Sequence, residues 1–95
     1  MAFFVYMLAS RRNGTLYIGS TENLRSRMVQ HRSGAVPGFT RSYGVTILVW
    51  FEIHETRESA LRRERAMKEW KRAWKIALIE KANSGWNDLS SQIPI

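Results

Sequence analysis

The chain contains no cysteine among its 95 residues. This absence excludes disulfides and metal sites built from thiolates. The chain also has a single aspartate, Asp88, which argues against a centre in which several carboxylates bridge two metal ions. A metal site here is therefore expected to hold one hard cation on few protein ligands. Water and a substrate phosphate would complete its coordination.

The sequence lacks long apolar runs. None reaches the roughly 20 residues that a membrane-spanning helix needs. The N-terminal run MAFFVYMLASRR is short and has no basic region before it, so we expect no signal peptide. We therefore expect a soluble, cytoplasmic protein without a membrane partner. Repeats and linkers are also absent from the sequence, and residues 1–95 are enough for one domain with one modest core.

Positive charge is abundant. The chain has 15 Lys plus Arg against 8 Asp plus Glu, a formal net charge of +7 and an isoelectric point near 10.6. Most of these cations are arginines, whose planar guanidinium suits bidentate contact with phosphate. This balance favours a polyanionic partner, with nucleic acid first, although a basic surface without any partner has the same composition.

The first half of the chain predicts a hairpin followed by a helix. Residues 2–10, AFFVYMLAS, are aromatic and β-branched and predict a strand that is covered on both faces. Residues 15–20, TLYIGS, predict its antiparallel partner across a turn. Thr21 is expected to cap a helix over residues 22–32, and Gly34 is expected to end it.

The second half predicts one strand and two helices. Residues 45–53, VTILVWFEI, form a nearly continuous apolar run that predicts a central strand. Helices are expected over 57–70 and 71–83, the second continuing or bending from the first. The tail over 84–95 is expected to be irregular, with Trp86 docking on the core. The order β-β-α-β-α-α predicts an α/β (α+β) domain with a small three-stranded sheet.

Glu64 is a carboxylate expected on the inward side of its helix. Ala60 and Leu61 stand four and three residues before it, and Met67 stands three after it, so these apolar residues share its face. A carboxylate on an apolar face is costly unless it is paired or coordinated. Two interpretations stay open, a salt bridge to Arg27 or a neighbouring arginine, and coordination of a metal ion.

A second group of candidates surrounds the hairpin. Tyr6 and Tyr17 are expected to project from neighbouring strands, where tyrosines are ordinarily core or rim residues. Gly19 leaves a strand end bare before the helix, which suits either a tight turn or the close approach of a phosphate. Arg27 and His31 lie four residues apart on one helix flank, where arginine binds negative charge and histidine also moves protons. Together with Tyr17 they are expected to surround one pocket.

Further cations recur through LRRERAMKEWKRAWK, spread around the helix rather than along one stripe. Trp70 and Trp74, four residues apart, are expected to form an edge of the core, with stacking on a nucleobase as the alternative. The residues to which we assign contacts with nucleic acid are Gly19, Arg25, Arg41, Lys68 and Arg72.

These residues resemble the GIY-YIG nuclease superfamily, and most closely its small single-domain bacterial members. FVY at residues 4–6 stands where the family has Gly-Ile-Tyr, and YIG at residues 17–19 is intact. The segments TENLRSRMVQH, GFTRSYGV and RRERAMKEWKRAWKIALIEKANSGWNDL extend the resemblance over nearly the whole chain. The departure is the pair Phe4 and Val5, which replaces Gly-Ile. The fold that the resemblance implies is a three-stranded antiparallel sheet flanked by helices.

The resemblance also implies roles. Glu64 corresponds to the family's metal-binding glutamate, holding a single Mg²⁺ or Mn²⁺. Tyr17 resembles the tyrosine beside the attacking water, and Tyr6 the tyrosine that supports it. Arg27 corresponds to the phosphate-binding arginine, and His31 occupies a position filled by His or Tyr. The implied reaction is endonucleolytic hydrolysis of a phosphodiester, in DNA ahead of RNA, as in homing endonucleases and a DNA-repair nuclease.

Two other functions fit the same residues. The domain could bind nucleic acid without cutting it, because a basic surface and a phosphate pocket serve both purposes. It could also be a nuclease subunit that needs a protein partner, with Trp86 and the tail as the interface. The identity of the general base stays open between Tyr17 and His31, because an unperturbed tyrosine is a poor base at neutral pH. Asn83 is a candidate for a late polar residue found in some relatives.

Overall fold

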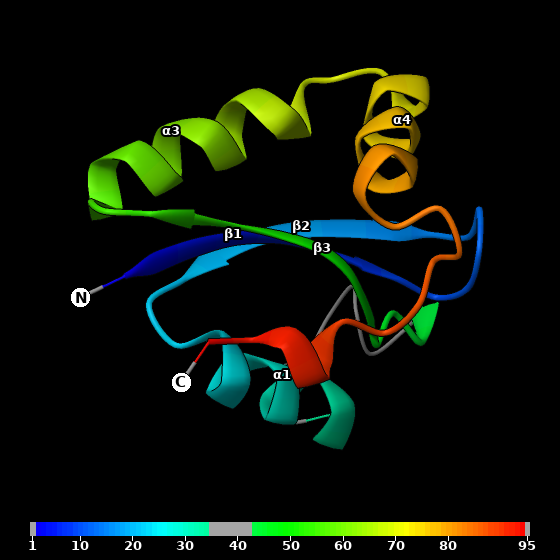
Figure 1. The fold of residues 1–95 in the computed structure, drawn as a ribbon, viewed down its shortest axis with the longest axis horizontal. Coiled ribbons are helices and arrows are strands. Elements are labelled where there is room, and N and C mark those ends of the chain that lie inside the picture. The colour runs from blue at the N-terminus through cyan, green and yellow to red at the C-terminus, as the bar shows by residue number, and fades with distance from the viewer. Residues whose placement is uncertain (1, 35–42, 95) are drawn as a thin grey trace.

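The computed structural model describes residues 2–34 and 43–94 and shows one sheet between two layers of helices (Figure 1). Helix α1 covers one face of the sheet, and α3 and α4 cover the other. No helix within the described ranges is both long enough and apolar enough to cross a membrane. The elements are β1 (Phe3–Ala9), β2 (Leu16–Thr21), α1 (Leu24–Ser33), β3 (Ile47–His54), α3 (Arg57–Lys68), α4 (Arg72–Ala82) and the 3₁₀ turn η1 (Ser90–Gln92).

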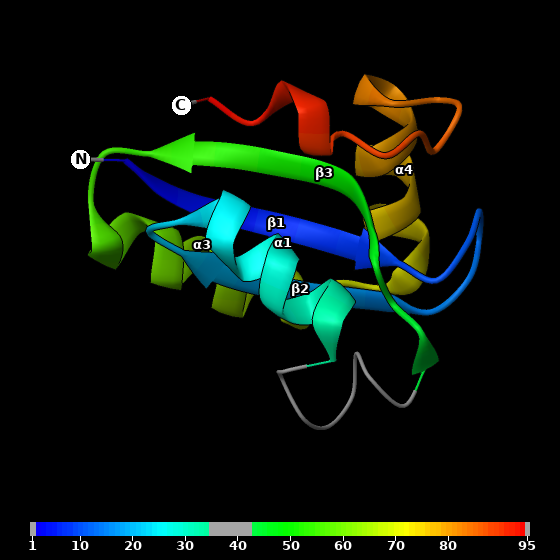
Figure 2. The ribbon, with the colours of Figure 1, turned by 90° about the horizontal axis from the view of Figure 1, so that it is seen from below.

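The sheet is antiparallel with the strand order β2-β1-β3. The predicted element order and fold class are therefore confirmed, but the prediction that residues 45–53 form the central strand is wrong. The central strand is β1, and β3 lies at an edge. The apolar character of β3 has another cause, because the C-terminal tail runs beside it (Figure 2) and the Leu89 amide donates to the Leu48 carbonyl at 2.8 Å.

Strand β1 contributes to the hydrophobic core on each side of the sheet, because its side chains alternate between the two faces. Val5 and Met7 are fully buried against the α3 and α4 layer, where Met67 also lies. Phe4 and Tyr6 are buried on the α1 side of the sheet. The prediction that this strand is covered on both faces is thus confirmed, and it fixes which side of the sheet each functional residue occupies.

Helix α1 begins later than predicted. Its N-cap is Asn23, whose side chain accepts a hydrogen bond from the Ser26 amide at 3.0 Å. Thr21 is instead the last residue of β2, and its hydroxyl accepts from the Asn23 amide at 3.1 Å. Asparagine and threonine are both good caps, so cap preference alone could not choose between them. Gly34 ends the helix as predicted, in a left-handed conformation with φ of 74°.

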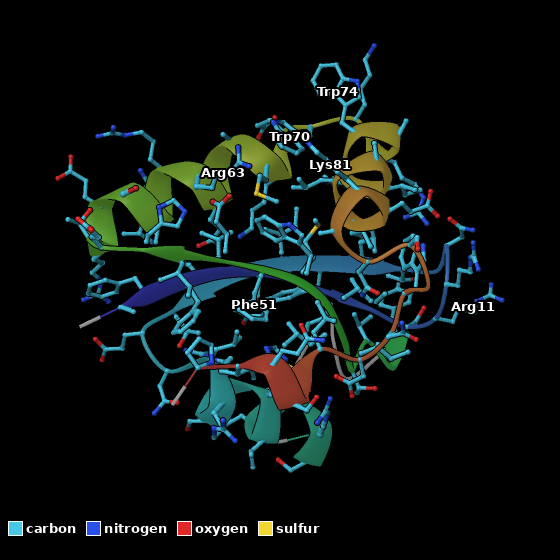
Figure 3. The ribbon with its side chains drawn as sticks, viewed as in Figure 1. Arg11, Phe51, Arg63, Trp70, Trp74 and Lys81 are labelled. Carbon is cyan, nitrogen blue, oxygen red and sulfur yellow. The ribbon has the colours of Figure 1, made fainter. Side chains whose placement is uncertain are left out.

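Helix α3 begins as predicted, with the Thr56 side chain accepting from the Ser59 amide at 3.1 Å. The chain then bends between α3 and α4, so Trp70 lies outside a helix and does not share a helical face with Trp74. Trp70 packs against the core, but Trp74 is 56% exposed, and the prediction that it forms a core edge is wrong (Figure 3).

The tail is held by a buried asparagine. Asn83 donates to the Val49 carbonyl at 3.0 Å and to the Asn87 carbonyl at 2.9 Å. Trp86 is buried in the core, as predicted. These contacts give Asn83 a structural role in anchoring the tail to β3.

Candidate active site

Three rings from β1, β2 and α1 form a cluster on the α1 side of the sheet. The ring centroids of Tyr17 and His31 are 5.4 Å apart, and Tyr6 lies 6.2 Å from Tyr17 and 6.0 Å from His31. The Tyr6 hydroxyl and His31 Nε2 are 3.1 Å apart, within hydrogen-bond distance. The structure therefore brings together the two tyrosines and the histidine that the sequence singled out.

Gly19 makes room for this cluster. It pairs directly with Tyr6 across the β1–β2 ladder. A Cβ atom at this position would lie 2.7 Å from the Tyr6 hydroxyl oxygen and 3.0 Å from Cε2 of Tyr17, closer than unbonded atoms normally approach. Gly19 is thus required within β2 by the tyrosine rings, and the tight-turn interpretation is wrong. The approach of a phosphate to its backbone stays a prediction.

Burial sets the protonation of the cluster. Burial chiefly raises the pKa of Tyr6, and the nearby Tyr17 hydroxyl raises it further, partly through a hydrogen bond. Tyr6 therefore keeps its proton at neutral pH and is a poor base. Burial also lowers the pKa of His31, and the charge of Arg27 adds to that effect. The His31 imidazole is then neutral at physiological pH and able to accept a proton.

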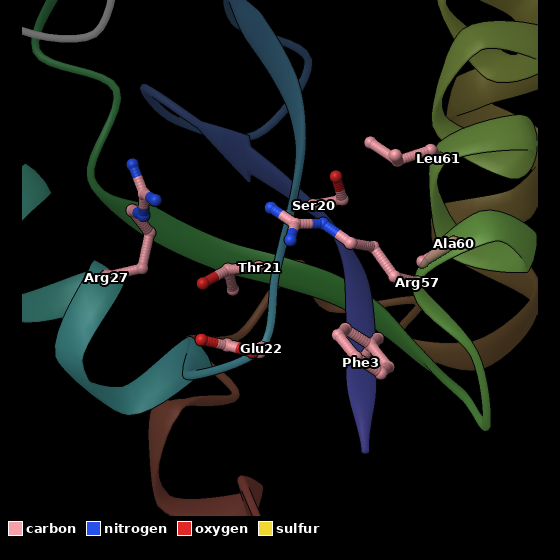
Figure 4. Close-up of a pocket in the computed structure, with 8 residues that line it drawn as sticks. All are labelled: Phe3, Ser20, Thr21, Glu22, Arg27, Arg57, Ala60 and Leu61. Carbon is pink, nitrogen blue, oxygen red and sulfur yellow. The ribbon is translucent and has the colours of Figure 1, made fainter. Parts of the chain in front are cut away.

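Arg27 lies one helical turn before His31 and is half-buried. Within the described residues no ion pair or hydrogen bond engages its guanidinium. Its side chain lines a cavity of about 240 Å³ beside Ser20 and Thr21 of β2 (Figure 4). A half-buried arginine without a partner, facing a cavity, is suited to binding an anion from solution.

Glu64 approaches β2 from the α3 side. Its side chain is only 16% exposed, in line with the predicted inward face. The Ser20 hydroxyl donates a short hydrogen bond to its Oε1, and Lys68 Nζ lies 2.6 Å from its Oε2. Within the described residues the salt-bridge partner is therefore Lys68 and not Arg27 or another arginine. Burial opposes ionisation, but the hydrogen bonds from Lys68 and Ser20 hold the pKa of Glu64 below its usual range.

The two groups meet at the outer edge of β2, with which no described strand pairs. Successive residues of a strand face opposite sides, so Gly19 accommodates the tyrosines on one face and Ser20 binds Glu64 on the other. The charges of Arg27 and Glu64 both act on the Tyr6 hydroxyl, the first lowering and the second raising its pKa. Glu64, Arg27 and the aromatic cluster thus surround one short stretch of an edge strand.

Lys68 extends this region along the strand. It lines a second cavity, of about 200 Å³, together with Tyr17 and Lys75 at the outer edge of β2. Lys68 therefore pairs with Glu64 and also shares a cavity with Tyr17. Of the predicted cationic contacts that fall within the described residues, it is the one at this edge.

The other predicted cationic contacts lie elsewhere. Arg25 donates to the carbonyl of Ile93 at 3.1 Å and so holds the tail. Arg72 donates to two carbonyls of the β1–β2 turn, at 2.7 and 2.6 Å. Arg41 lies outside the described residues. Their assignment to nucleic acid stays a prediction.

The residues at the edge of β2 offer few ligands for a divalent cation. Within the described ranges no group of three His, Asp or Glu side chains gathers to hold a metal. Glu64 supplies one hard carboxylate, and the Ser20 hydroxyl stands beside it. Mg²⁺ commonly binds through one or two carboxylates while water and substrate phosphates complete its shell. The Lys68 ammonium on Oε2 belongs to a half-exposed side chain that can move away. The donor set fits a single hydrated ion.

Sequence reasoning missed two residues of this region. Ser20 could have been found from strand alternation, because it is the residue after YIG that faces away from Tyr17. Arg57 lines the same cavity as Arg27. The sequence offers one indication of Arg57, because it directly follows the Thr56 cap, where a positive charge opposes the helix dipole.

Comparisons with known proteins agree with this geometry. Residues 2–77 match the GIY-YIG catalytic domain. The chain is 37% identical over 76 residues to UPF0213 protein CPE1444 of Clostridium perfringens, covering 80% of this chain and 81% of that protein. It is 31% identical over 77 residues to UPF0213 protein SH2523 of Staphylococcus haemolyticus, covering 81% and 93% of the two chains.

A solved structure shows the same fold. The solution NMR structure of the UPF0213 protein BH0048 from Bacillus halodurans superposes with a TM-score of 0.58 at 26% sequence identity, covering 100% of both chains. The resemblance to small bacterial members of the superfamily is thereby confirmed. With its YIG strand, its Arg27-bearing helix and its Glu64-bearing helix gathered at one sheet edge, this chain belongs to the GIY-YIG family.

Proposed function

We propose that the protein is an endonuclease that hydrolyses phosphodiester bonds with a divalent metal ion, in DNA ahead of RNA. One observation carries this proposal. Glu64, Arg27 and the Tyr6–Tyr17–His31 cluster come from two helices and two strands yet surround one edge of β2. A site for phosphodiester hydrolysis needs an anion-binding group, a metal-binding carboxylate and a proton acceptor, and this edge supplies one of each.

Arg27 would bind the phosphate. Its side chain borders the cavity at the β2 edge, and its guanidinium makes no ion pair within the described residues. An arginine stays protonated throughout the reaction, so it stabilises the negative charge that builds on the phosphorane oxygens.

Glu64 would hold the metal, Mg²⁺ or Mn²⁺. When bound, such an ion neutralises charge on the phosphate and on the leaving oxygen. Lys68 must then leave Oε2, and its ammonium would stay within reach of the incoming phosphate beside Tyr17. The Ser20 hydroxyl would keep the carboxylate oriented through Oε1.

The rings would position and deprotonate the attacking water. Tyr17 is half-buried and lines the outer edge of β2, where a water could reach its hydroxyl. Tyr6 keeps its proton and fixes the position of Tyr17. His31 is neutral and hydrogen-bonded to Tyr6, so it would accept the hydroxyl proton of Tyr17 while Tyr17 takes a proton from the attacking water.

A nuclease assay tests this function. Wild type is incubated with single- and double-stranded DNA and RNA in Mg²⁺ or Mn²⁺, beside Glu64→Ala, Arg27→Ala and Glu58→Ala. Glu58 is a matched control, because it is a carboxylate on the same helix that pairs with Arg62 at the surface. Cutting should be lost in the first two variants and kept in the third. Cutting that survives both site substitutions would come from a contaminant and would refute the proposal.

One observation favours a second function, binding without cleavage. Lys68 already neutralises Glu64, so the edge can accept a phosphate without any metal. In that case wild type binds DNA but never cuts it, and Glu64→Ala binds more tightly because Lys68 loses its partner and its ammonium can contact the phosphate. A nuclease would instead show metal-dependent cutting that Glu64→Ala abolishes.

A further inference from the structure

Arg57 is the first residue of α3, and its side chain is exposed. Within the described residues no ion pair or hydrogen bond engages its side chain. Glu58, the acid next to it in sequence, pairs with Arg62 at 3.0 Å. A cation in the first turn of a helix opposes the helix dipole and lowers stability. Stability therefore gives no reason for an arginine at this position.

Arg57 and Arg27 line the same cavity from opposite layers of the fold. Figure 4 shows Arg57 extending from α3 toward Ser20, while Arg27 comes from α1 on the other side of β2. Phe3 and Leu61 add apolar surface to the wall. The cavity, about 240 Å³, is smaller than the roughly 300–1,000 Å³ typical of pockets for whole small molecules. Its size and lining suit one unit of a polymer that combines an anionic and an apolar part.

We propose that this cavity binds the nucleotide next to the one whose phosphate is cleaved. Arg57 contacts the phosphate of that neighbouring nucleotide, and Phe3 and Leu61 cover its sugar or base. This assignment rests on the proposed function, which places the substrate strand along the β2 edge. Arg27 then lies between the cleaved phosphate and the neighbouring one.

Glu22 allows a second test, in which removing a negative charge should have the opposite effect on binding to removing Arg57. It is the acidic residue among those lining the cavity, and within the described residues it pairs with neither arginine. A carboxylate here repels a phosphate. Neutralising it should strengthen binding, whereas neutralising Arg57 should weaken it.

The experiment measures binding without metal, so that no cutting occurs. A fluorescein-labelled DNA single strand and its duplex are titrated by fluorescence anisotropy in EDTA at several salt concentrations. Arg57→Gln should raise Kd by about three- to tenfold and reduce the salt slope by about one, because one phosphate contact is lost. Glu22→Gln should lower Kd by about twofold. Arg11→Gln is the control, since it changes net charge equally at the far hairpin end of the molecule (Figure 3).

The outcomes separate this proposal from the nuclease itself. A Kd for Arg57→Gln that matches Arg11→Gln overturns the nucleotide site, even where wild type cuts DNA. Weakened binding in Arg57→Gln together with tightened binding in Glu22→Gln supports the site, even where wild type never cuts. Circular dichroism should show that Arg57→Gln melts no lower than wild type, which excludes misfolding as the cause of weak binding.

Discussion

Gly19→Ala should distort the aromatic cluster while leaving the fold intact. The added Cβ would lie 2.7 Å from the Tyr6 hydroxyl oxygen, whereas comfortable contacts begin near 3.5 Å. The Tyr6 ring must therefore retreat by about 1 Å. It has little room, because its side chain is 1% exposed and its hydroxyl is 3.1 Å from His31.

The magnitude follows from two opposing effects. Overpacking a buried site costs about 1–3 kcal/mol. Replacing glycine in a strand stabilises by about 0.4–1 kcal/mol, because alanine restricts the unfolded chain. The net loss is about 1–2 kcal/mol, which lowers Tm by about 5–15 °C in a domain of this size. A displacement of about 1 Å at the reacting groups should also reduce any cleavage rate by about 100-fold.

Thermal unfolding and an NMR titration of His31 measure the two consequences. Gly44→Ala is the control, because its Cβ would meet nothing within 4 Å although its φ is +61°. That variant should lose a similar amount of stability from backbone strain, about 1–2 kcal/mol, without changing the His31 titration. A Gly19→Ala protein with wild-type Tm and an unchanged His31 titration would show that the cluster does not depend on a bare backbone.

Three further substitutions test separate parts of the structure. Lys68→Ala removes a half-exposed ion pair, so the unfolding free energy should change by less than about 1 kcal/mol. The Mn²⁺ affinity measured by calorimetry should rise about two- to fivefold, because the ammonium no longer competes for Glu64. Weaker Mn²⁺ binding would contradict the assignment of Glu64. Wild type should lose stability as pH falls below about 6.5, the ordinary pKa of histidine, because the unfolded chain then binds a proton that buried His31 refuses. The loss should end at the lowered pKa of the folded state, and urea unfolding should show no such dependence in His31→Gln. Asn23→Ala should cost about 1 kcal/mol and lower Tm by about 4–8 °C; an unchanged melting curve would mean that this cap does not hold α1.

Periodicity predicted which side of the sheet most functional residues occupy. Glu64 is largely buried because Ala60, Leu61 and Met67 share its helix face, and this spacing is visible in the sequence. Residues 2–10 alternate between two faces and are apolar on both, so the sequence predicts a strand that is covered on both faces. These predictions depend on local geometry, and local geometry is what a sequence specifies most directly.

Strand order could not be predicted in this way. The apolar run in β3 predicts a central strand, because burial by a neighbouring strand and burial by a tail leave the same pattern. The Leu89–Leu48 hydrogen bond shows that the tail covers this edge. The partner of Glu64 was missed for a different reason. Glu64 and Lys68 have the i, i+4 spacing that favours an ion pair on one helix, so this partner is visible in the sequence once the helix is predicted.

The position of the candidate site follows from what lies beside each of the two edges of the sheet. A sheet separates the residues of α1 from those of α3, so the two layers can meet only around an edge. The tail hydrogen-bonds to β3 and occupies one edge. At the other edge no described strand pairs with β2, and the cavities beside it are lined by Arg27, Tyr17 and Lys68. Gly19 and Ser20 then serve opposite layers from adjacent positions, the first by having no side chain and the second by binding Glu64. Because an exposed edge also invites pairing with another strand, we expect the cations beside β2 to discourage association with a second sheet.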